Sequence, residues 1–330
     1  MLAVAAAYEG SFMYDQFQRQ INYMRISLTD RCNLRCRYCR PSLPDFAQEG
    51  DALSYEEILR VCRLVIVLGV GRFKITGGEP LLREGAAAFI GALKKLPGAE
   101  QVTLTTNGTY FARYAAQLRQ AGLDCVNFSL DTLDGGAYAR LTGGSLAQTL
   151  RGVEAAARER IKFKLNCVLL EGLTERELPS LVRFAAGYGA PLRFIELMPL
   201  ACNRDLRCLS GERARAVLAQ AEIVLRLADA AYGNGPATYY RAAGYAIPVG
   251  FIEPLHNKFC SRCNRVRLTS AGLLKTCLYR PAALDLRAAL RGGASDDELL
   301  SALRRAIYDK PAGHGFADCP ADFSMSEIGG

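Results

Sequence analysis

The chain has 330 residues and a mass of 36.0 kDa, and 50% of its residues are hydrophobic. This composition excludes a disordered chain, and the length predicts about two domains of ordinary size. The net charge of +8 comes from 41 basic and 33 acidic side chains and suits a polyanionic ligand such as a nucleotide. No run of five like charges occurs, so we expect no specific nucleic-acid partner.

The N-terminal and apolar segments predict neither a signal peptide nor a membrane span. The longest apolar stretch, residues 61–70, is interrupted by Arg63 and has about half the length that a membrane span needs. Residues 1–8 are apolar but lack the basic start and the length of a signal peptide. We therefore expect a cytoplasmic protein without a membrane partner. Residues 1–12 are expected to be an N-terminal extension, because Met13 is a more credible start.

Short β-rich runs alternate with longer helical patterns between residues 21 and 197. Six strands are predicted, at residues 23–28, 72–76, 101–105, 125–130, 162–169 and 192–197. Helices are predicted at residues 55–68, 85–95, 113–121, 146–158, 175–185 and 210–221. Ser54 is a candidate N-cap of the first helix, and Thr174 with Glu177 forms a candidate capping box at 175–185.

The series of β–α units predicts an α/β fold with a parallel sheet, since each crossover returns the chain to the same edge. Polar and apolar residues alternate within several strands, as they do over residues 162–166. A doubly wound open sheet buries both faces and would be more uniformly apolar. The alternation favours an incomplete parallel (β/α)6 barrel whose lumen holds a ligand.

The pattern changes after residue 221. Residues 232–236 read Tyr-Gly-Asn-Gly-Pro, which is typical of a loop, and short strands and an irregular end follow. We therefore expect the barrel domain to span residues 13–230 and a smaller α+β module to span residues 231–330.

Three cysteines follow the first predicted strand with the spacing C-x3-C-x2-C: Cys32, Cys36 and Cys39. Three thiolates on one loop can bind a cuboidal iron–sulfur cluster. Because such a cluster has four iron corners, one iron would stay open to a substrate or cofactor. A zinc site is the alternative, but the two histidines of the chain, His256 and His314, are far away in sequence.

A second triplet has the spacing C-x2-C-x13-C and consists of Cys260, Cys263 and Cys277. The C-x2-C pair is common in zinc sites, and Cys319 or His256 could complete such a site. Spacing alone therefore leaves both zinc and an iron–sulfur cluster open. The remaining cysteines are scattered, and twelve in 330 residues are too few for a disulfide scaffold.

Two motifs resemble those of radical S-adenosylmethionine (SAM) enzymes. Residues 32–39 resemble the cluster loop of that superfamily, and Thr76-Gly77-Gly78-Glu79-Pro80 resembles its GGEP motif, in which paired glycines let a ligand approach the backbone. Further segments resemble the MoaA family, the GTP 3′,8-cyclases of molybdenum cofactor biosynthesis: residues 15–17, 22–27, 29–33, 104–108, 127–131, 193–199, 260–277 and 325–330. The resemblance covers about residues 13–330 and both cysteine spacings.

The resemblance implies a lyase that converts GTP to (8S)-3′,8-cyclo-7,8-dihydro-GTP. It implies SAM and two [4Fe–4S] clusters as cofactors, with SAM at the open iron of the first cluster and guanine facing that of the second. A SAM-derived radical would remove hydrogen from ribose carbon 3′, and the resulting radical would attack guanine carbon 8. An external electron donor and a homodimer are further expectations.

The resemblance also assigns roles to individual residues. The metal ligands would be the six cysteines of the two triplets. The expected SAM contacts are Tyr38, Gly78, Ser129 and Met198, with Arg193 at the SAM carboxylate. The expected GTP contacts are Arg25, Lys74, Thr105, Lys164, Arg265 and Arg267. Gly329 and Gly330 would form a catalytic tail that enters the active site.

Two departures and two alternatives accompany this interpretation. Lys74 stands where some family members have arginine, and Arg40 stands where methionine is usual. A radical SAM peptide-modifying enzyme with an auxiliary cluster is an alternative, although such enzymes usually carry more C-terminal cysteines. A nucleic-acid-binding regulator with zinc or an iron–sulfur cluster would leave the Gly-Gly-Glu-Pro segment unexplained.

Overall fold

The computed structural model describes residues 12–39, 52–229, 232–316 and 325–328. Six parallel strands pair with one another in chain order. They are β1 Tyr23–Ser27, β2 Arg72–Thr76, β3 Gln101–Thr106, β4 Cys125–Ser129, β5 Phe163–Leu169 and β6 Leu192–Glu196. Each bound lies within one residue of its prediction, and the incomplete parallel barrel is confirmed.

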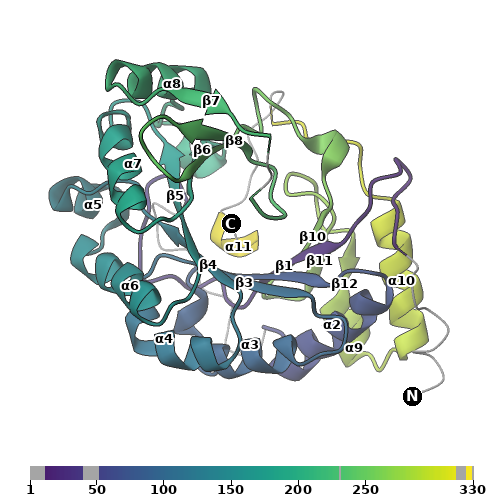
Figure 1. Ribbon diagram of the computed structural model, residues 1–330. Helices are drawn as coiled ribbons and strands as arrows, with labels where there is room; N and C mark the ends of the chain where they lie inside the picture. The colour runs from purple at the N-terminus through teal and green to yellow at the C-terminus, as the bar shows by residue number, and fades with distance from the viewer. Residues whose placement is uncertain (1–11, 40–51, 230–231, 317–324, 329–330) are drawn as a thin grey trace.

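Helices surround these strands, as the view along the barrel shows (Figure 1). They are α2 Tyr55–Val67, α3 Ala86–Lys94, α4 Phe111–Gln120, α5 Gly135–Thr142, α6 Leu146–Arg158, α7 Leu178–Gly187 and α8 Gly211–Gln220. The sequence did not predict α5, because two glycines at its start lower the helix propensity. Among the described residues, none of the helices is long and apolar enough to span a membrane.

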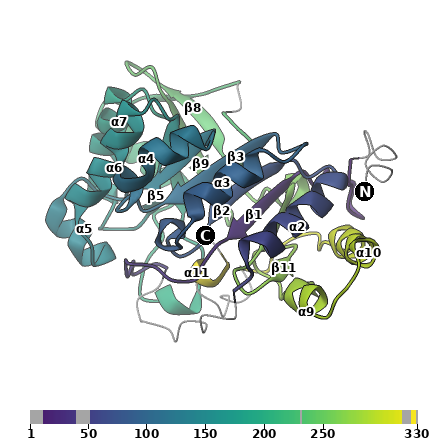
Figure 2. The ribbon, with the colours of Figure 1, turned by 90° about the horizontal axis from the view of Figure 1, so that it is seen from below.

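The chain after β6 extends the sheet at both edges. Beyond β6 lie β9 Pro248–Ile252, β8 Thr238–Ala242 and β7 Leu225–Leu227, and beyond β1 lie β10 Arg265–Leu268, β11 Leu273–Lys275 and β12 Leu284–Asp285. β9 pairs parallel with β6, and β10 pairs parallel with β1. Helices α9 Leu286–Arg291 and α10 Asp296–Tyr308 lie beside β11 and α2 (Figure 2). The domain boundary at residue 231 stays a prediction.

Alternation along the strands separates the core from the lumen. On β5, Phe163, Leu165 and Cys167 are buried in the main apolar core. The intervening Lys164 and Asn166 are half-buried and line the barrel cavity. Because side chains on a strand alternate between its two faces, one run of sequence supplies both the packing under the helices and the polar lumen.

Two predicted helix caps have different outcomes. Ser54 forms the expected cap of α2, where its hydroxyl accepts from Glu57 N at 3.2 Å and Glu57 Oε2 accepts from Ser54 N at 2.6 Å. The capping box at Thr174 is wrong, because the Thr174 hydroxyl accepts instead from Leu170 N at 2.8 Å. The helix α7 begins at Leu178, since Pro179 lacks an N–H and fits only the first turn of a helix.

Candidate active site

Both cysteine triplets line one cavity at the carboxyl ends of the barrel strands. Its volume is about 320 Å³, and its lining includes Cys32, Cys36, Cys39, Cys260, Cys263 and Cys277. The N-terminal triplet lies on the loop after β1, and the C-terminal triplet lies on the segments before β10 and after β11. Because β10 pairs with β1, triplets from opposite ends of the chain open onto the same space.

The end of α5 anchors the loop of the N-terminal triplet. Arg35 N donates to Thr142 O at 2.7 Å, and Arg37 N donates to Leu141 O at 3.0 Å. Both acceptors lie in the last turn of α5. The helix that the sequence did not predict therefore fixes the main chain on either side of Cys36.

The paired glycines after β2 pack directly against the same loop. A Cβ on Gly78 would lie 2.3 Å from Arg31 O, and one on Gly77 would lie 2.7 Å from Thr29 O. Gly78 N also donates to Thr29 O at 2.7 Å. The sequence predicts these glycines to admit a ligand, and the close approach in the structure is to the main chain of the cysteine loop.

The N-terminal triplet lies in a buried, anionic environment. Burial raises the pKa of the Cys36 thiol well above its usual range, and Cys39, Asp131 and Cys32 raise it further. Burial also raises the pKa of Asp131 to about 6, and this carboxylate accepts from the Tyr38 hydroxyl at 2.7 Å. Three thiols in this setting become thiolates together when a bound metal compensates their charge.

The C-terminal triplet lies among cations instead. Burial opposes ionisation of the Cys263 thiol, but Arg265 and Lys310 outweigh it and lower its pKa to about 7. The Lys310 side chain is buried and lines the same cavity as the cysteines. The two triplets therefore line one cavity from surroundings of opposite charge.

The chemistry of both triplets allows a cuboidal iron–sulfur cluster as well as a single metal ion. Within the described ranges, no three Cys, His, Asp or Glu side chains converge closely enough to hold one ion. A zinc ion binds each thiolate at about 2.3 Å and needs its ligands close together. A cuboidal cluster binds each thiolate through a different iron, so its ligands lie farther apart. His256, an alternative zinc ligand, bonds to Glu196 Oε1, and Cys319 lies outside the described residues.

A larger cavity of about 830 Å³ continues into the barrel lumen. It shares Arg25, Thr105 and Arg265 with the lining of the smaller cavity. The strand register places Arg267 beside Arg25 and Arg25 beside Lys74, so basic side chains from β10, β1 and β2 form one row. Neighbouring strands lie about 4.8 Å apart, which concentrates positive charge on this wall.

The row of basic residues has perturbed acid–base properties. Burial lowers the pKa of Arg25 to about 10, and it lowers those of Arg267 and Lys74 well below their usual ranges. Neighbouring arginines add to each decrease. Among the described residues that line the larger cavity, only Asp124 is acidic, and it pairs with Lys94 Nζ at 2.7 Å. A polyanion is the ligand that such a lumen favours.

Loop 232–236 closes one side of this lumen. Lys164 Nζ donates to Tyr232 O, and Arg72 Nη1 donates to Asn234 Oδ1 at 2.9 Å. Within the part of the chain that the structure describes, three buried polar atoms around the lumen have no hydrogen-bond partner, namely Asn166 Oδ1, Arg193 Nε and Asn234 Nδ2. Because buried polar atoms are usually satisfied, these three atoms are available to bound water or to a polar ligand.

Comparisons with known proteins place the chain in a family. The model for the radical SAM superfamily matches residues 26–185, and the model named Molybdenum Cofactor Synthesis C matches residues 190–316. The GTP 3′,8-cyclase of Moorella thermoacetica is 41% identical over 96% of this chain and 100% of its own length. That of Paracoccus denitrificans is 41% identical over 96% of this chain and 92% of its own. The chain belongs to the GTP 3′,8-cyclase family.

A solved structure supports the fold of this GTP 3′,8-cyclase chain. Streptococcus suis SuiB bound to S-adenosylmethionine matches with a TM-score of 0.61 over 94% of this chain and 69% of SuiB. The two sequences are 14% identical, so the likeness concerns the fold alone.

The predicted residues of the cyclase gather at the two connected cavities. The four residues predicted to contact SAM all line the smaller cavity: Tyr38, Gly78, Ser129 and Met198. Of the predicted GTP contacts, Arg25, Lys74, Thr105, Lys164 and Arg265 line the larger cavity, and Arg267 lines the smaller one. Gly329 and Gly330 lie outside the described residues. The preceding helix α11 Met325–Ile328 lies in the centre of the barrel (Figure 1), and Met325 lines the smaller cavity.

Sequence reasoning about the cyclase missed several polar residues. Asn127 and Asn166 line the lumen, and Arg193 lies with them, since its Nη2 donates to Asn127 Oδ1 at 2.6 Å. Arg193 therefore lines the larger cavity and is not part of the smaller cavity's lining. The sequence offered one indication of both asparagines: each is a single polar residue at an inward-facing position of an apolar strand. No sequence pattern indicated a role for Lys310, because it lies in a loop after a helix and belongs to no motif.

Proposed function

We propose that this chain converts GTP to (8S)-3′,8-cyclo-7,8-dihydro-GTP with SAM and two [4Fe–4S] clusters, as a lyase in the first step of molybdenum cofactor biosynthesis. Membership in the GTP 3′,8-cyclase family supports the reaction. The observation that carries the two-cluster assignment is the opening of both triplets onto one cavity that continues into a basic lumen. Cys32, Cys36 and Cys39 would hold the first cluster, and Cys260, Cys263 and Cys277 would hold the second.

The N-terminal side of the smaller cavity would bind SAM. When bound, a four-iron cluster with one open iron supplies the electron that splits SAM into methionine and a 5′-deoxyadenosyl radical. Asp131 holds the Tyr38 hydroxyl at 2.7 Å, which would orient this side chain beside SAM. Ser129 and Met198 would contact SAM from the ends of β4 and β6, Met198 through flexible packing. The enclosing side chains would keep water from the radical.

The lumen would bind the triphosphate of GTP. Arg25 in the lumen and its register partner Arg267 at the smaller cavity can each donate two parallel hydrogen bonds to phosphate, and Lys74 and Lys164 add point charges. Arg265 lines both cavities, so it suits the region between the phosphates and the guanine base. This placement would direct guanine toward the C-terminal triplet and ribose carbon 3′ toward the smaller cavity. Holding both reacting carbons in register is the contribution that the protein makes to the rate.

The catalytic tail and the partners complete the proposal. Gly329 and Gly330 would enter the active site behind α11, because their lack of side chains suits a narrow space. An external electron donor, a homodimer and a cytoplasmic location stay predictions. No observation favours the alternative of a peptide-modifying enzyme, since the likeness to SuiB concerns the fold alone.

Iron and sulfide quantitation with GTP-binding measurements on the same anaerobic sample tests this proposal. The chain should contain about eight irons, and Cys263→Ser should contain about four. Cys208→Ser is the matched control, because Cys208 is absent from the linings of both cavities. A parent chain with about four irons that Cys263→Ser leaves unchanged would contradict the second cluster. Failure to form the cyclised product from GTP would contradict the reaction.

A further inference from the structure

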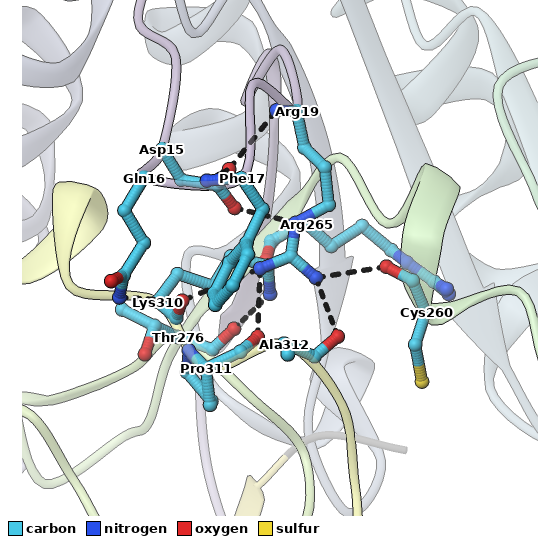
Figure 3. Close-up of polar contacts among 10 residues, drawn as sticks. All are labelled: Asp15, Gln16, Phe17, Arg19, Cys260, Arg265, Thr276, Lys310, Pro311 and Ala312. Carbon is cyan, nitrogen blue, oxygen red and sulfur yellow. Dashed lines mark hydrogen bonds and ion pairs between the residues drawn. The ribbon is translucent and has the colours of Figure 1, made fainter.

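A buried arginine near the start of the chain holds the loop of the C-terminal triplet. Arg19 Nη1 donates to Cys260 O at 2.8 Å and to Ala312 O at 2.9 Å, and Nη2 donates to Pro311 O at 2.7 Å. Figure 3 shows the guanidinium between Asp15 and these carbonyl groups. The main chain of Cys260 is thereby tied both to the N-terminal segment and to the turn after α10.

Asp15 sets the orientation of this arginine. Its Oδ2 accepts from Arg19 Nε at 2.6 Å, while Oδ1 accepts from Phe17 N at 2.9 Å and from Arg19 N at 3.0 Å. Arg19 Nη2 makes a further bond to Lys310 O at 3.4 Å. A guanidinium has five N–H donors, and these contacts engage all five. Arg19 therefore has no donor left for a substrate or cofactor and acts through the main chain.

Lys310 bonds to the main chain near the other two cysteines of the triplet. Its Nζ donates to Thr276 O, immediately before Cys277, and to Arg265 O at 3.0 Å, two residues after Cys263. The side chain is 2% exposed, and no carboxylate of the described residues forms an ion pair with it. Two carbonyl groups close to Cys263 and Cys277 in sequence therefore hold this ammonium group.

We propose that Arg19 and Lys310 form a main-chain clamp that fixes the spacing of Cys260, Cys263 and Cys277 before a cluster binds. The clamp rests on the proposed function, because it needs the second cluster at this triplet. Arg19 fixes Cys260, Lys310 fixes the neighbours of Cys263 and Cys277, and the Arg19–Lys310 O bond joins the two halves. Both are positioning residues, and Asp15 supports Arg19.

Conservative variants separate this role from general support of the fold. Arg19→Lys keeps the charge but presents its donors from one nitrogen, which cannot reach Asp15, Cys260 O and Pro311 O together. Lys310→Met keeps the length and removes both the charge and the donors. We expect each variant to lower total iron from about eight to about four per chain and to remove the spectral signature of the C-terminal cluster. The signature of the N-terminal cluster should stay.

Arg60→Lys is the matched control for the arginine variant. Arg60 also joins an aspartate and a carbonyl group near α10, through Nε to Asp296 Oδ1 at 2.8 Å and Nη2 to Ala294 O at 2.8 Å. These contacts lie at the opposite end of α10 from Lys310, away from the cysteines. Arg60→Lys should therefore keep about eight irons and both signatures.

The measurements are iron per chain, electron paramagnetic resonance of the reduced protein, and the thermal unfolding midpoint. Spectra of Cys36→Ser and Cys263→Ser provide the references for the two clusters. Selective loss of the C-terminal signature in Arg19→Lys and Lys310→Met supports the clamp. Retention of eight irons with an unchanged spectrum, or equal loss of both signatures with a lowered midpoint, overturns it. If Cys263→Ser itself leaves iron unchanged, the proposed second cluster fails, and this outcome is distinct from a failure of the clamp.

Discussion

Arg25 and Arg267 are register partners on adjacent parallel strands, although they come from opposite ends of the chain. Arg25 has Lys74 as its register partner on the other side, so the three basic side chains follow one line across the barrel wall. Buried like charges at strand spacing repel one another in a medium of low dielectric constant. A bound triphosphate would compensate this repulsion, which is the physical basis of the first prediction.

Arg267→Ala or Arg265→Ala should weaken GTP binding by about 1.5–3 kcal/mol for each lost charged hydrogen bond, or roughly 10- to 150-fold in affinity. SAM affinity should change less, because neither Arg265 nor Arg267 is among the predicted SAM contacts. Calorimetric titration of both ligands checks this prediction. The control is Arg226→Ala on exposed β7, which should bind GTP as the parent does. Equal loss of GTP and SAM binding would point to misfolding.

Cys36→Ala should abolish reductive SAM cleavage. The N-terminal cluster would lose one of its three ligands and be lost or misassembled. Iron at the C-terminal triplet should remain, since Arg19 and Lys310 hold that triplet independently of the loop that carries Cys36. Formation of 5′-deoxyadenosine by the variant is the measurement. A rate equal to that of the parent would show that the N-terminal triplet is wrongly assigned.

The Glu79 carboxyl should make stability fall as the pH rises. Burial raises its pKa from 4.5 to about 7, although Asn107 N, Leu81 N and the Thr106 hydroxyl donate to it. The folded chain keeps this proton up to about pH 7, whereas the unfolded chain loses it near pH 4.5. The stability that the group contributes is therefore complete below pH 4.5 and lost by about pH 7, in total about 3 kcal/mol.

Glu79→Gln removes this titration. The free energy of unfolding is measured with denaturant between pH 5 and 8. As the pH rises, the value for the parent should fall relative to the value for the variant. Glu154→Gln on the exposed face of α6 is the control and should show a constant difference. A constant difference for Glu79→Gln would contradict the raised pKa.

Deletion of Gly329 and Gly330 should reduce formation of the cyclised product by a factor on the order of 100, because small misplacements of reacting groups cost large rate factors. The preceding helix α11 supports this expectation, since Ile328 is buried and Met325 lines the cavity with both triplets. Iron content and GTP affinity of the truncated chain should match those of the parent. Normal turnover would show that the tail is dispensable.

The sequence by itself determined the β–α units and the grouping of the cysteines. Strand bounds were predicted to within one residue, because alternation with period two and turn residues act over a few neighbours. Cys32, Cys36 and Cys39 could be grouped from the sequence for the same reason, because all three lie in one short loop. Prediction failed where tertiary contacts overrode local preference: α5 begins with two glycines, and the Thr174 hydroxyl bonds to Leu170 rather than capping a helix.

Only the tertiary structure decided which strands pair and which distant side chains meet. The pairing of β10 with β1 brings the two triplets onto one cavity and places Arg267 in line with Arg25. No local pattern encodes such a pairing, since it depends on which sheet edge remains free after the whole barrel has packed. The contacts of Arg19 with Cys260 and with the turn at Pro311 arise in the same way. They join three segments far apart in sequence, and each segment alone reads as an ordinary loop.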